Sequence, residues 1–380
     1  MSVTVKFGNT GGDSEKDKSG IIDITTGWIT VNSNCNSRCK WCYLGELVAQ
    51  PSRYADLQMV KRAIDFYKEL GIVSLVFIGG EPTLYPGLQD VVRHASLRNI
   101  PELTVVTNGR RLYDQDYASA LAKAGLDIFS ITIHSTKKDL HDLISGRKAA
   151  HHAFAGVKNA VKTGKKCFIN LVVSKDNIGD VEESIPVFLN DWGVANVTVS
   201  CANPSVIGDK VDGTESLHPD RFAELVVRLA HFPKEVKILL ELPLCIIPEP
   251  ILIKLLKEQR LGFGCHVGLG SGIILDIDGD ILPCNSFPGH KMIKLFDGDR
   301  VLYSPEEFLK VWSLDPEFRE FRREVNVYRS DKCVECGIWQ ICNSGCPIVY
   351  GHYEPDEIIK GIPMSMTLVR VQSLLKGGDI

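Results

Sequence analysis

Two spacings of apolar residues alternate along residues 28–201. Short β-branched or apolar runs end in glycine or polar residues, and longer segments between them carry apolar residues about every 3.6 positions, as amphipathic helices do. The short runs predict strands over 28–34, 73–80, 102–109, 127–135, 167–173 and 196–201. The longer segments predict helices over 56–70, 87–98, 114–125, 153–164 and 180–193. This alternation predicts a parallel sheet covered by helices, either open or closed as a barrel.

Unusual residues follow the carboxyl ends of these predicted strands. Cys35 follows the first strand, Gly79-Gly80-Glu81-Pro82 the second, Thr107-Asn108-Gly109 the third, and His134 ends the fourth. Ligand sites in parallel β/α folds gather at the carboxyl ends of the strands. We therefore expect these residues to meet at one rim of the sheet.

The pattern changes after residue 201. Residues 202–217 contain Pro, Gly and Asp and predict a linker, and 219–231 and 249–259 predict helices on either side of the apolar stretch 236–245. From Gly262 to about residue 350 the segments become short, glycine-rich and cysteine-bearing, and the last thirty residues carry no pattern that we interpret.

Composition excludes some classes of protein. The 380 residues are 44% hydrophobic with a formal net charge of -4, which gives no sign of a nucleic-acid partner. The first twenty residues lack the apolar region of a signal peptide, and no apolar run reaches the ~18 residues of a membrane span. A soluble, cytoplasmic protein is expected.

Twelve cysteines are many for such a protein. In a reducing compartment they indicate metal binding or catalysis rather than disulfides. Most fall in patterned groups, whereas Cys167, Cys201 and Cys245 have apolar sequence neighbours and are expected to be buried as small hydrophobic residues.

Cys35, Cys39 and Cys42 lie within eight residues, with no fourth cysteine nearby. Three thiolates can hold three irons of a cubane [4Fe–4S] cluster and leave the fourth iron open for a substrate or cofactor to chelate. The alternatives are a zinc site or a cluster completed by a distant fourth cysteine.

The Cys-x3-Cys-x2-Cys triplet after the first strand, with GGEPTL (79–84) after the second, resembles the radical S-adenosylmethionine (SAM) superfamily. The resemblance implies an α/β fold, a partial (β/α)6 TIM-like barrel. It implies a [4Fe–4S] cluster whose open iron binds the amino and carboxylate groups of SAM, and a flavodoxin- or ferredoxin-type electron donor. Reductive cleavage of SAM would give a 5'-deoxyadenosyl radical that abstracts hydrogen from a substrate.

The resemblance also implies contacts to SAM. The Gly79-Gly80 backbone and the Glu81 side chain would hold the methionine ammonium, Trp41 would lie against the adenine or belong to the core, and Arg147 would pair with the carboxylate. His134 stands where many members have an acid. The implied cofactor-binding residues are Trp41, Gly79, Gly80, Glu81, Thr107, Asn108, Thr132, Arg147 and Asn170.

A second cysteine group lies near the C-terminus, as Cys265-x13-Gly279-x4-Cys284 followed by Cys333-x2-Cys336-x5-Cys342-x3-Cys346. The spacing resembles the SPASM domain, which implies one or two auxiliary [4Fe–4S] clusters. Family ligation would assign Cys265, Cys284 and Cys346 to the first and Cys333, Cys336 and Cys342 to the second, each one ligand short.

Several ways of filling these positions stay open. Cys245 would complete the first set, or its iron would be open to substrate. The second would take an oxygen or nitrogen ligand, with His352, Glu354 and Asp356 as candidates, or would be absent. A zinc knuckle over 333–346 is the alternative to clusters.

The resemblance divides the chain into five parts. They are an N-terminal extension (1–27), a radical SAM core (28–208), a helical linker (209–262), a SPASM-like domain (263–350) and a tail (351–380).

Similar enzymes often modify ribosomally made precursor peptides by crosslinking, excision or other oxidation, so a peptide or protein substrate is the expected one. Since 34 residues precede Cys35, we expect leader recognition by a separate adaptor protein or by residues 209–260. The alternatives are a small-molecule dehydrogenase acting on sugars or aminocyclitols, and a non-catalytic Fe–S or zinc protein.

Overall fold

The structure, a computed structural model, describes residues 21–45, 51–207, 210–265, 269–287, 290–361 and 366–375. Its main sheet has eleven strands in the order β10-β9-β6-β5-β4-β3-β2-β1-β11-β12-β13. These strands are β1 (Thr26–Thr30), β2 (Ser74–Ile78), β3 (Glu102–Thr107), β4 (Ile128–Thr132), β5 (Lys166–Val173), β6 (Asn196–Cys201), β9 (Val236–Leu240), β10 (Leu261–Phe263), β11 (Gly272–Leu275), β12 (Asp280–Leu282) and β13 (Ile293–Lys294).

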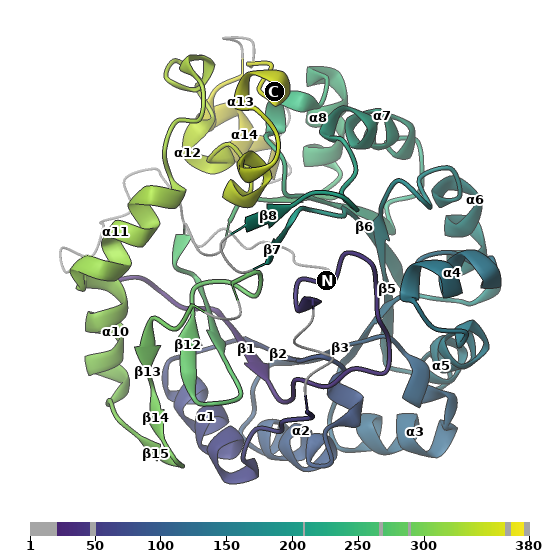
Figure 1. The fold of residues 1–380 in the computed structure, drawn as a ribbon, viewed down its shortest axis with the longest axis vertical. Helices are drawn as coiled ribbons and strands as arrows, with labels where there is room; N and C mark the ends of the chain where they lie inside the picture. Colours follow the sequence, from purple (N-terminus) through teal and green to yellow (C-terminus); the bar gives the residue numbers. More distant parts are fainter. Residues whose placement is uncertain are drawn as a thin grey trace.

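Strands β1 to β6 pair with their neighbours in parallel and in chain order, as the sequence predicts. The sheet curves, and helices lie along its outer side, so the fold is a partial TIM-like barrel (Figure 1). The outer helices are α1 (Leu57–Glu69), α2 (Leu88–Leu97), α3 (Gln115–Lys123), α4 (Lys138–Ser145), α5 (Ala150–Lys162), α6 (Val181–Pro186), α7 (Pro219–Leu229) and α8 (Glu249–Lys257).

Helix α4 is absent from the sequence prediction. Its N-terminal residue Lys137 makes no side-chain capping hydrogen bond, so the usual start signal is missing. The helix ends at Gly146, whose φ of 65° is the left-handed conformation that glycine adopts readily. Helix α6 is shorter than predicted, because the chain continues from Pro186 as a π-helical turn over Val187–Asp191.

Residues 209–262, expected to be a helical linker, also extend the barrel sheet. The predicted helices are α7 and α8, but β9 lies between them and pairs in parallel with β6, and β10 pairs in parallel with β9. The burial of β9 alternates along Val236–Leu240, as expected of a strand that packs on one face.

The cysteine-bearing C-terminal region begins as part of the same sheet. Strand β11 pairs in parallel with β1 on the side opposite β2, and β12 and β13 follow in antiparallel order. Beyond them lie β14 (Phe296–Asp297), β15 (Arg300–Val301), α10 (Pro305–Leu314), α11 (Pro316–Val325), α12 (Trp339–Cys342), α13 (Pro355–Ile358) and α14 (Leu368–Leu375).

The stretch 202–217, expected to be a linker, forms a hairpin of β7 (Ser205–Ile207) and β8 (Lys210–Asp212), paired in antiparallel fashion. The hairpin packs near the C-terminal region, since Gly351 approaches Val211 closely. None of the described helices combines enough length with enough apolar surface to traverse a bilayer.

Two apolar clusters hold the barrel. A large cluster lies between the sheet and the helices and includes Phe77 and Phe129, both fully buried. A small one contains Trp28, Val76, Ile78, Ile274 and Leu282, from β1, β2, β11 and β12. Because residues alternate along a strand, the small cluster lies on the opposite, inner face of the sheet.

Arg260 stabilises the barrel wall formed by α7 and β9. Its buried guanidinium donates to the carbonyl oxygens of Val236 (2.8 Å), Ala230 (3.1 Å) and Leu229 (2.6 Å). Arg260→Leu leaves these acceptors unpaired, so we expect it to lower the free energy of unfolding by about 3–5 kcal/mol. Denaturant unfolding measures this, with the exposed Arg93→Leu as a control expected to change it by less than about 1 kcal/mol. Equal stabilities of the two variants would contradict this role of Arg260.

Candidate active site

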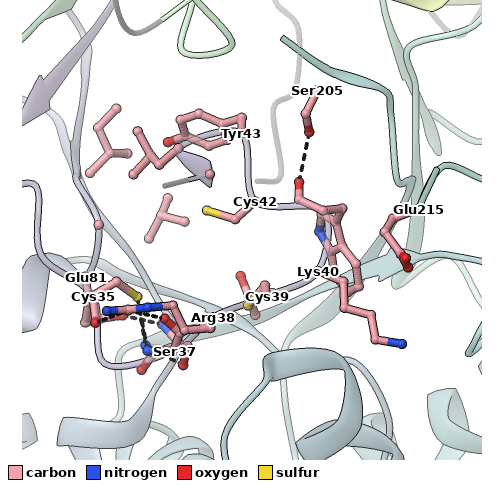
Figure 2. A pocket seen from close by; sticks show the side chains of 18 of the residues that line it. Cys35, Ser37, Arg38, Cys39, Lys40, Cys42, Tyr43, Glu81, Ser205 and Glu215 are labelled. Atoms are coloured by element: carbon pink, nitrogen blue, oxygen red, sulfur yellow. Dashed lines mark hydrogen bonds between the residues drawn. The ribbon is translucent and has the colours of Figure 1, made fainter. Parts of the chain in front are cut away.

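Cys35, Cys39 and Cys42 lie on the loop that follows β1, called here the thiol loop (residues 35–42). Their side chains line one pocket of about 390 Å³, the thiol pocket, together with residues from the ends of β2, β3 and β4 (Figure 2). The predicted convergence on one rim is therefore confirmed. Of the predicted cofactor-binding residues, those that line it are Trp41, Gly79, Gly80, Glu81, Thr107, Asn108 and Thr132.

The residues after β3 anchor the start of the thiol loop. Asn108 Nδ2 donates to Asn36 Oδ1 (2.7 Å) and Ser37 Oγ (3.2 Å), and the Arg110 guanidinium donates to the Asn36 carbonyl. Arg38 folds back and donates to the carbonyl oxygens of Cys35 and Ser37, both at 2.7 Å. The loop is thus held by protein hydrogen bonds around its three sulfurs.

The end of α4 holds the middle of the same loop. The Arg38 amide donates to the Ser145 carbonyl (2.8 Å), and the Lys40 ammonium pairs with Asp176 (2.6 Å). A side chain at Gly146 would place its Cβ 2.3 Å from the Arg38 carbonyl oxygen, so this position requires glycine for close approach as well as for its φ.

The glycines after β2 let the backbone of that turn pack directly against the chain entering the thiol loop. A Cβ on Gly79 would lie 2.6 Å from the Asn32 carbonyl oxygen, and one on Gly80 would lie 2.3 Å from the Asn34 carbonyl oxygen. The Gly80 amide donates to Asn32 (3.0 Å) and the Glu81 amide to Asn34 (2.8 Å). The pattern Gly-Gly-Glu therefore sets the distance between the turn and Cys35.

The Glu81 carboxylate is buried and bonded to the protein. One oxygen accepts from the Thr83 amide (3.1 Å) and from the hydroxyls of Thr83 and Thr107 (both 2.5 Å), and the other accepts from the Asn108 amide (2.7 Å). Burial raises the pKa of Glu81, and these hydrogen bonds oppose the rise. The expectation that this side chain holds an ammonium group stays a prediction. In the structure, the four hydrogen bonds that the carboxylate accepts tie the β2 turn to the end of β3.

Replacing Glu81 with glutamine tests that role. Both carboxylate oxygens of Glu81 accept hydrogen bonds, so the NH2 group of a glutamine would face a donor whichever oxygen it replaces. We therefore expect the free energy of unfolding to fall by about 1–3 kcal/mol. The exposed Glu69→Gln on α1 is the matched control, expected to leave it within ~0.5 kcal/mol. Denaturant titration compares them, and unchanged stability of Glu81→Gln would refute the assigned hydrogen-bond role.

The three thiols are largely removed from water. Burial raises the pKa of Cys35 to about 11 and that of Cys39 to about 12. The Ser37 amide donates to Cys35 Sγ at 3.3 Å and opposes the rise, as amide donors do for metal-bound sulfur. The free thiols therefore keep their protons, and iron would displace them.

His134 lies behind the thiol loop, at the end of β4. Its Nε2 is 3.8 Å from Cys39 Sγ, and its ring meets Trp41 edge to face with 4.6 Å between centroids. Burial lowers the pKa of His134 well below its ordinary value, and His141 lowers it further, so the imidazole is neutral. The neutral ring therefore places no charge beside Cys39 and Trp41, which it contacts.

Two predicted residues do not line the thiol pocket. Arg147 is exposed beyond the end of α4. Asn170, on β5, donates to Ser130 Oγ at 2.7 Å. The contacts to SAM expected of Arg147 and Asn170 stay predictions.

Other pocket residues were missed from the sequence. Lining side chains from the hairpin region 203–216 come from a stretch expected to be a linker, and Ser205 donates to the Trp41 carbonyl (3.4 Å; Figure 2). The sequence of this stretch is polar and typical of a loop, so it did not predict that these residues line a pocket. The missed lining residues are Ser37, Arg38, Lys40, Tyr43, Leu44, Gly45, Ile78, Val106, Asn203, Ser205, Asp212, Glu215 and Ser216.

The C-terminal thiols form two groups. In the first, burial raises the pKa of Cys346 well above its ordinary value, and Glu241, Cys265 and Cys284 raise it further, which makes these four residues electrostatic neighbours. Burial also raises the pKa of Glu241 to about 7, against the hydrogen bond donated by Asn203 (2.6 Å). The second group contains Cys333, Cys336 and Cys342.

The three residues considered as extra ligands of the second group have other surroundings. His352 packs on Gly213 and on the Tyr353 ring, and Asp356 accepts from Ser330 Oγ at 2.7 Å. Glu354 precedes α13. Cys245, by contrast, lies beside this group of sulfurs.

Comparisons with known proteins agree with this geometry. A model of the radical SAM superfamily matches residues 29–185. A probable GTP 3',8-cyclase of Sulfurisphaera tokodaii is 28% identical over 213 residues, which cover 54% of this chain and 66% of the relative. The GTP 3',8-cyclase of Petrotoga mobilis is 32% identical over 153 residues, which cover 39% of this chain and 46% of the relative. These matches span two thirds or less of either relative.

Solved structures with the same fold cover nearly the whole chain. Streptococcus suis SuiB bound to S-adenosylmethionine gives a TM-score of 0.68 at 20% identity, over 90% of this chain and 79% of SuiB. The enzyme anSMEcpe with bound AdoMet gives 0.65 at 16% identity, over 93% of this chain and 95% of that one. Residues 29–185 thus match the radical SAM superfamily in sequence, and the whole chain shares its fold with these solved structures.

Proposed function

We propose that this protein is a radical SAM enzyme that acts on a peptide or protein substrate. The observation that carries the proposal is the set of three half-buried thiols, Cys35, Cys39 and Cys42, around one pocket in a region that matches the radical SAM superfamily. When bound, a [4Fe–4S] cluster and SAM would supply an electron and a 5'-deoxyadenosyl radical able to take hydrogen from a C–H bond.

The thiol pocket suits this chemistry. Cys35, Cys39 and Cys42 would hold the cluster, and the pocket that they line would receive SAM. Gly79 and Gly80 expose backbone with no side chain in the way, and Thr132 and Asn108 offer polar groups at the rim. Ser205 and Asp212 of the β7–β8 hairpin line one wall of the pocket.

A peptide substrate is supported by the extent of the fold likeness. The likeness to SuiB covers 90% of this chain, so it extends into the C-terminal cysteine region. The structure of SuiB bound to its precursor peptide SuiA gives a TM-score of 0.68 with this chain. We include a flavodoxin- or ferredoxin-type electron donor, a separate leader-binding adaptor and a cytoplasmic location in the proposal.

A GTP substrate is the second candidate, because the curated relatives are GTP 3',8-cyclases. A triphosphate needs free cations. The described cations lining the thiol pocket are Arg38, which donates to two backbone carbonyls, and Lys40, which pairs with Asp176. Acidic residues line it too, namely Glu81, Asp212 and Glu215, so the described lining offers a triphosphate no excess of positive charge.

The first C-terminal group supports an auxiliary cluster of SPASM type. Cys265, Cys284 and Cys346 gather beside Glu241. Glu241 follows β9, Cys265 follows β10, Cys284 follows β12 and Cys346 follows α12. Glu241 is joined through Asn203 to the thiol pocket. We propose that these three thiols bind a cluster that accepts the electron left after hydrogen abstraction, making the overall reaction an oxidation.

Anaerobic reconstitution with iron and sulfide, followed by dithionite and SAM, tests the proposal. We expect 5'-deoxyadenosine to form, and to increase when a substrate peptide encoded beside the gene is added, with a mass loss in the peptide. Stimulation by GTP instead would establish the cyclase reading, and stimulation by free sugars or aminocyclitols would establish a small-molecule dehydrogenase. No cleavage of SAM by an iron-loaded protein would indicate a non-catalytic metal protein.

A further inference from the structure

The segment carrying Cys245 lies against the second C-terminal thiol group. Cys245 sits in a short 3-10 helix, Leu244–Ile246, at the carboxyl side of β9. The Leu244 amide donates to Cys342 Sγ at 3.3 Å, and the Cys346 amide donates to the Glu241 carbonyl at 2.7 Å. Two stretches about a hundred residues apart in sequence therefore run side by side.

Gly345 makes this close approach feasible. Its φ is 80°, and a side chain there would place a Cβ 2.7 Å from the Glu241 carbonyl oxygen and 2.7 Å from the Leu242 carbonyl carbon. The turn between Cys342 and Cys346 is thus shaped to receive the backbone that leads to Cys245.

The thiols of Cys245, Cys333, Cys336 and Cys342 are electrostatic neighbours as a result. Burial raises the pKa of Cys245, and the thiols of Cys333 and Cys336 raise it further. Burial raises the pKa of Cys342 to about 12, with added contributions from Cys245 and Cys336. Each thiol of this group therefore has at least one other within electrostatic reach, and Cys245 is a full member.

Hydrogen-bond donors surround these sulfurs. Backbone amides of Lys360 and Gly361 face Cys245 and lower its pKa, those of Ile338 and Trp339 do the same at Cys336, and Ser344 Oγ is 3.4 Å from Cys333 Sγ. Such donors stabilise thiolates bound to iron. By contrast, burial is the sole cause of the raised pKa at Cys167, in the barrel core.

The spacing of the thiols disfavours a single zinc ion. Among the described residues, the ligand atoms of three His, Cys, Asp or Glu side chains lie within 4.8 Å of one another only at Asp276, Asp278 and Asp280, where Lys291 neutralises them. Around one zinc ion, Zn–S bonds of about 2.3 Å bring all four sulfurs within about 4 Å of each other. A cubane separates its thiolates more widely, because each binds a different iron.

We propose that Cys245 is the fourth ligand of an auxiliary [4Fe–4S] cluster held by Cys333, Cys336 and Cys342. The cluster is fully ligated by protein, so it serves electron transfer or structure rather than substrate binding. The three-thiol group of Cys265, Cys284 and Cys346 is then the auxiliary site with room for a non-cysteine ligand. The inference deepens the proposed function, since it assigns the second auxiliary site of the same enzyme.

Alkylation with iodoacetamide, followed by peptide mass spectrometry, tests the ligand directly. In the reconstituted protein we expect Cys245 to react at least ~tenfold more slowly than in chelator-treated protein, in parallel with Cys333, Cys336 and Cys342. Equal reactivity of Cys245 in both forms, with the other three protected, would overturn the assignment. If the four thiols are protected but the protein contains zinc instead of iron, the assignment of an iron–sulfur cluster is wrong.

Variants provide a second readout. Cys245→Ala is expected to speed loss of about four irons per chain to a chelator by at least ~tenfold. Cys201→Ala, whose buried thiol donates to the Leu217 carbonyl (3.6 Å), is the matched control and should release iron like the wild type. Identical release from both variants would refute the ligand role. Neither measurement depends on SAM cleavage. Both therefore test the ligand role of Cys245 even if the wild-type protein does not cleave SAM.

Discussion

Replacing Cys42 with alanine is expected to lower formation of 5'-deoxyadenosine by more than about a hundredfold. Mutating residues that only hydrogen-bond to metal ligands already lowers metal affinity or activity by about 10–100-fold. Cys42 is expected to bind iron directly, so its loss should have a larger effect. Iron per chain should fall by about four atoms, the content of one [4Fe–4S] cluster. Chromatography of the SAM products and an iron assay measure both effects, and Cys35→Ala and Cys39→Ala should match.

Cys167→Ala is the control for these variants. Cys167 is 2% exposed on β5, away from the thiol loop, so its loss should leave iron content and SAM cleavage close to wild type. Persistent SAM cleavage by a protein lacking all three loop cysteines would overturn the proposed chemistry, because no other described thiols line the thiol pocket.

Gly80→Ala is expected to weaken SAM binding at least tenfold, which is about 1.4 kcal/mol. The new Cβ would lie 2.3 Å from the Asn34 carbonyl oxygen, so the β2 turn and the chain entering the thiol loop must separate. That movement displaces Cys35 and costs about 1–3 kcal/mol of stability as an overpacked contact. Equilibrium binding of SAM to the reconstituted protein and denaturant unfolding measure the two effects.

Gly179→Ala is the matched control. A Cβ at Gly179 meets nothing within 4 Å, so the same change adds a methyl group in open space. SAM affinity and stability should both stay near wild-type values. A Gly80→Ala variant that binds SAM as well as Gly179→Ala does would show that the turn can give way without moving the thiol loop.

The sequence predicted the barrel because local and tertiary preferences agree there. Runs such as 73–80 are apolar on both faces, which only a strand covered on both sides satisfies, and β2 lies at Ser74–Ile78. The thiol loop and Gly79-Gly80 were placed correctly for a related reason. Both follow strands directly, so the rim of a parallel sheet brings them together without long-range information.

The remaining site residues depend on contacts that no local pattern encodes. The polar stretch containing Ser205 and Glu215 reads as a linker, yet it forms a wall of the thiol pocket, where Ser205 donates to the Trp41 carbonyl on the thiol loop. Cys245 has apolar neighbours in sequence and reads as a core residue. Its neighbours in the fold depend on the hydrogen bond from the Leu244 amide to Cys342 Sγ, between residues ninety-eight positions apart.

Strand β1 is flanked by β2 on one side and by β11 on the other, and Ile29 pairs with Leu275. During synthesis the β11 side of β1 stays without its partner until the ribosome has made and released residue 275, long after the thiol loop has emerged. An unpaired strand edge invites pairing with other chains. Chaperones that shield nascent edges, and the timing of iron delivery relative to chain release, should therefore govern the yield of active protein in cells.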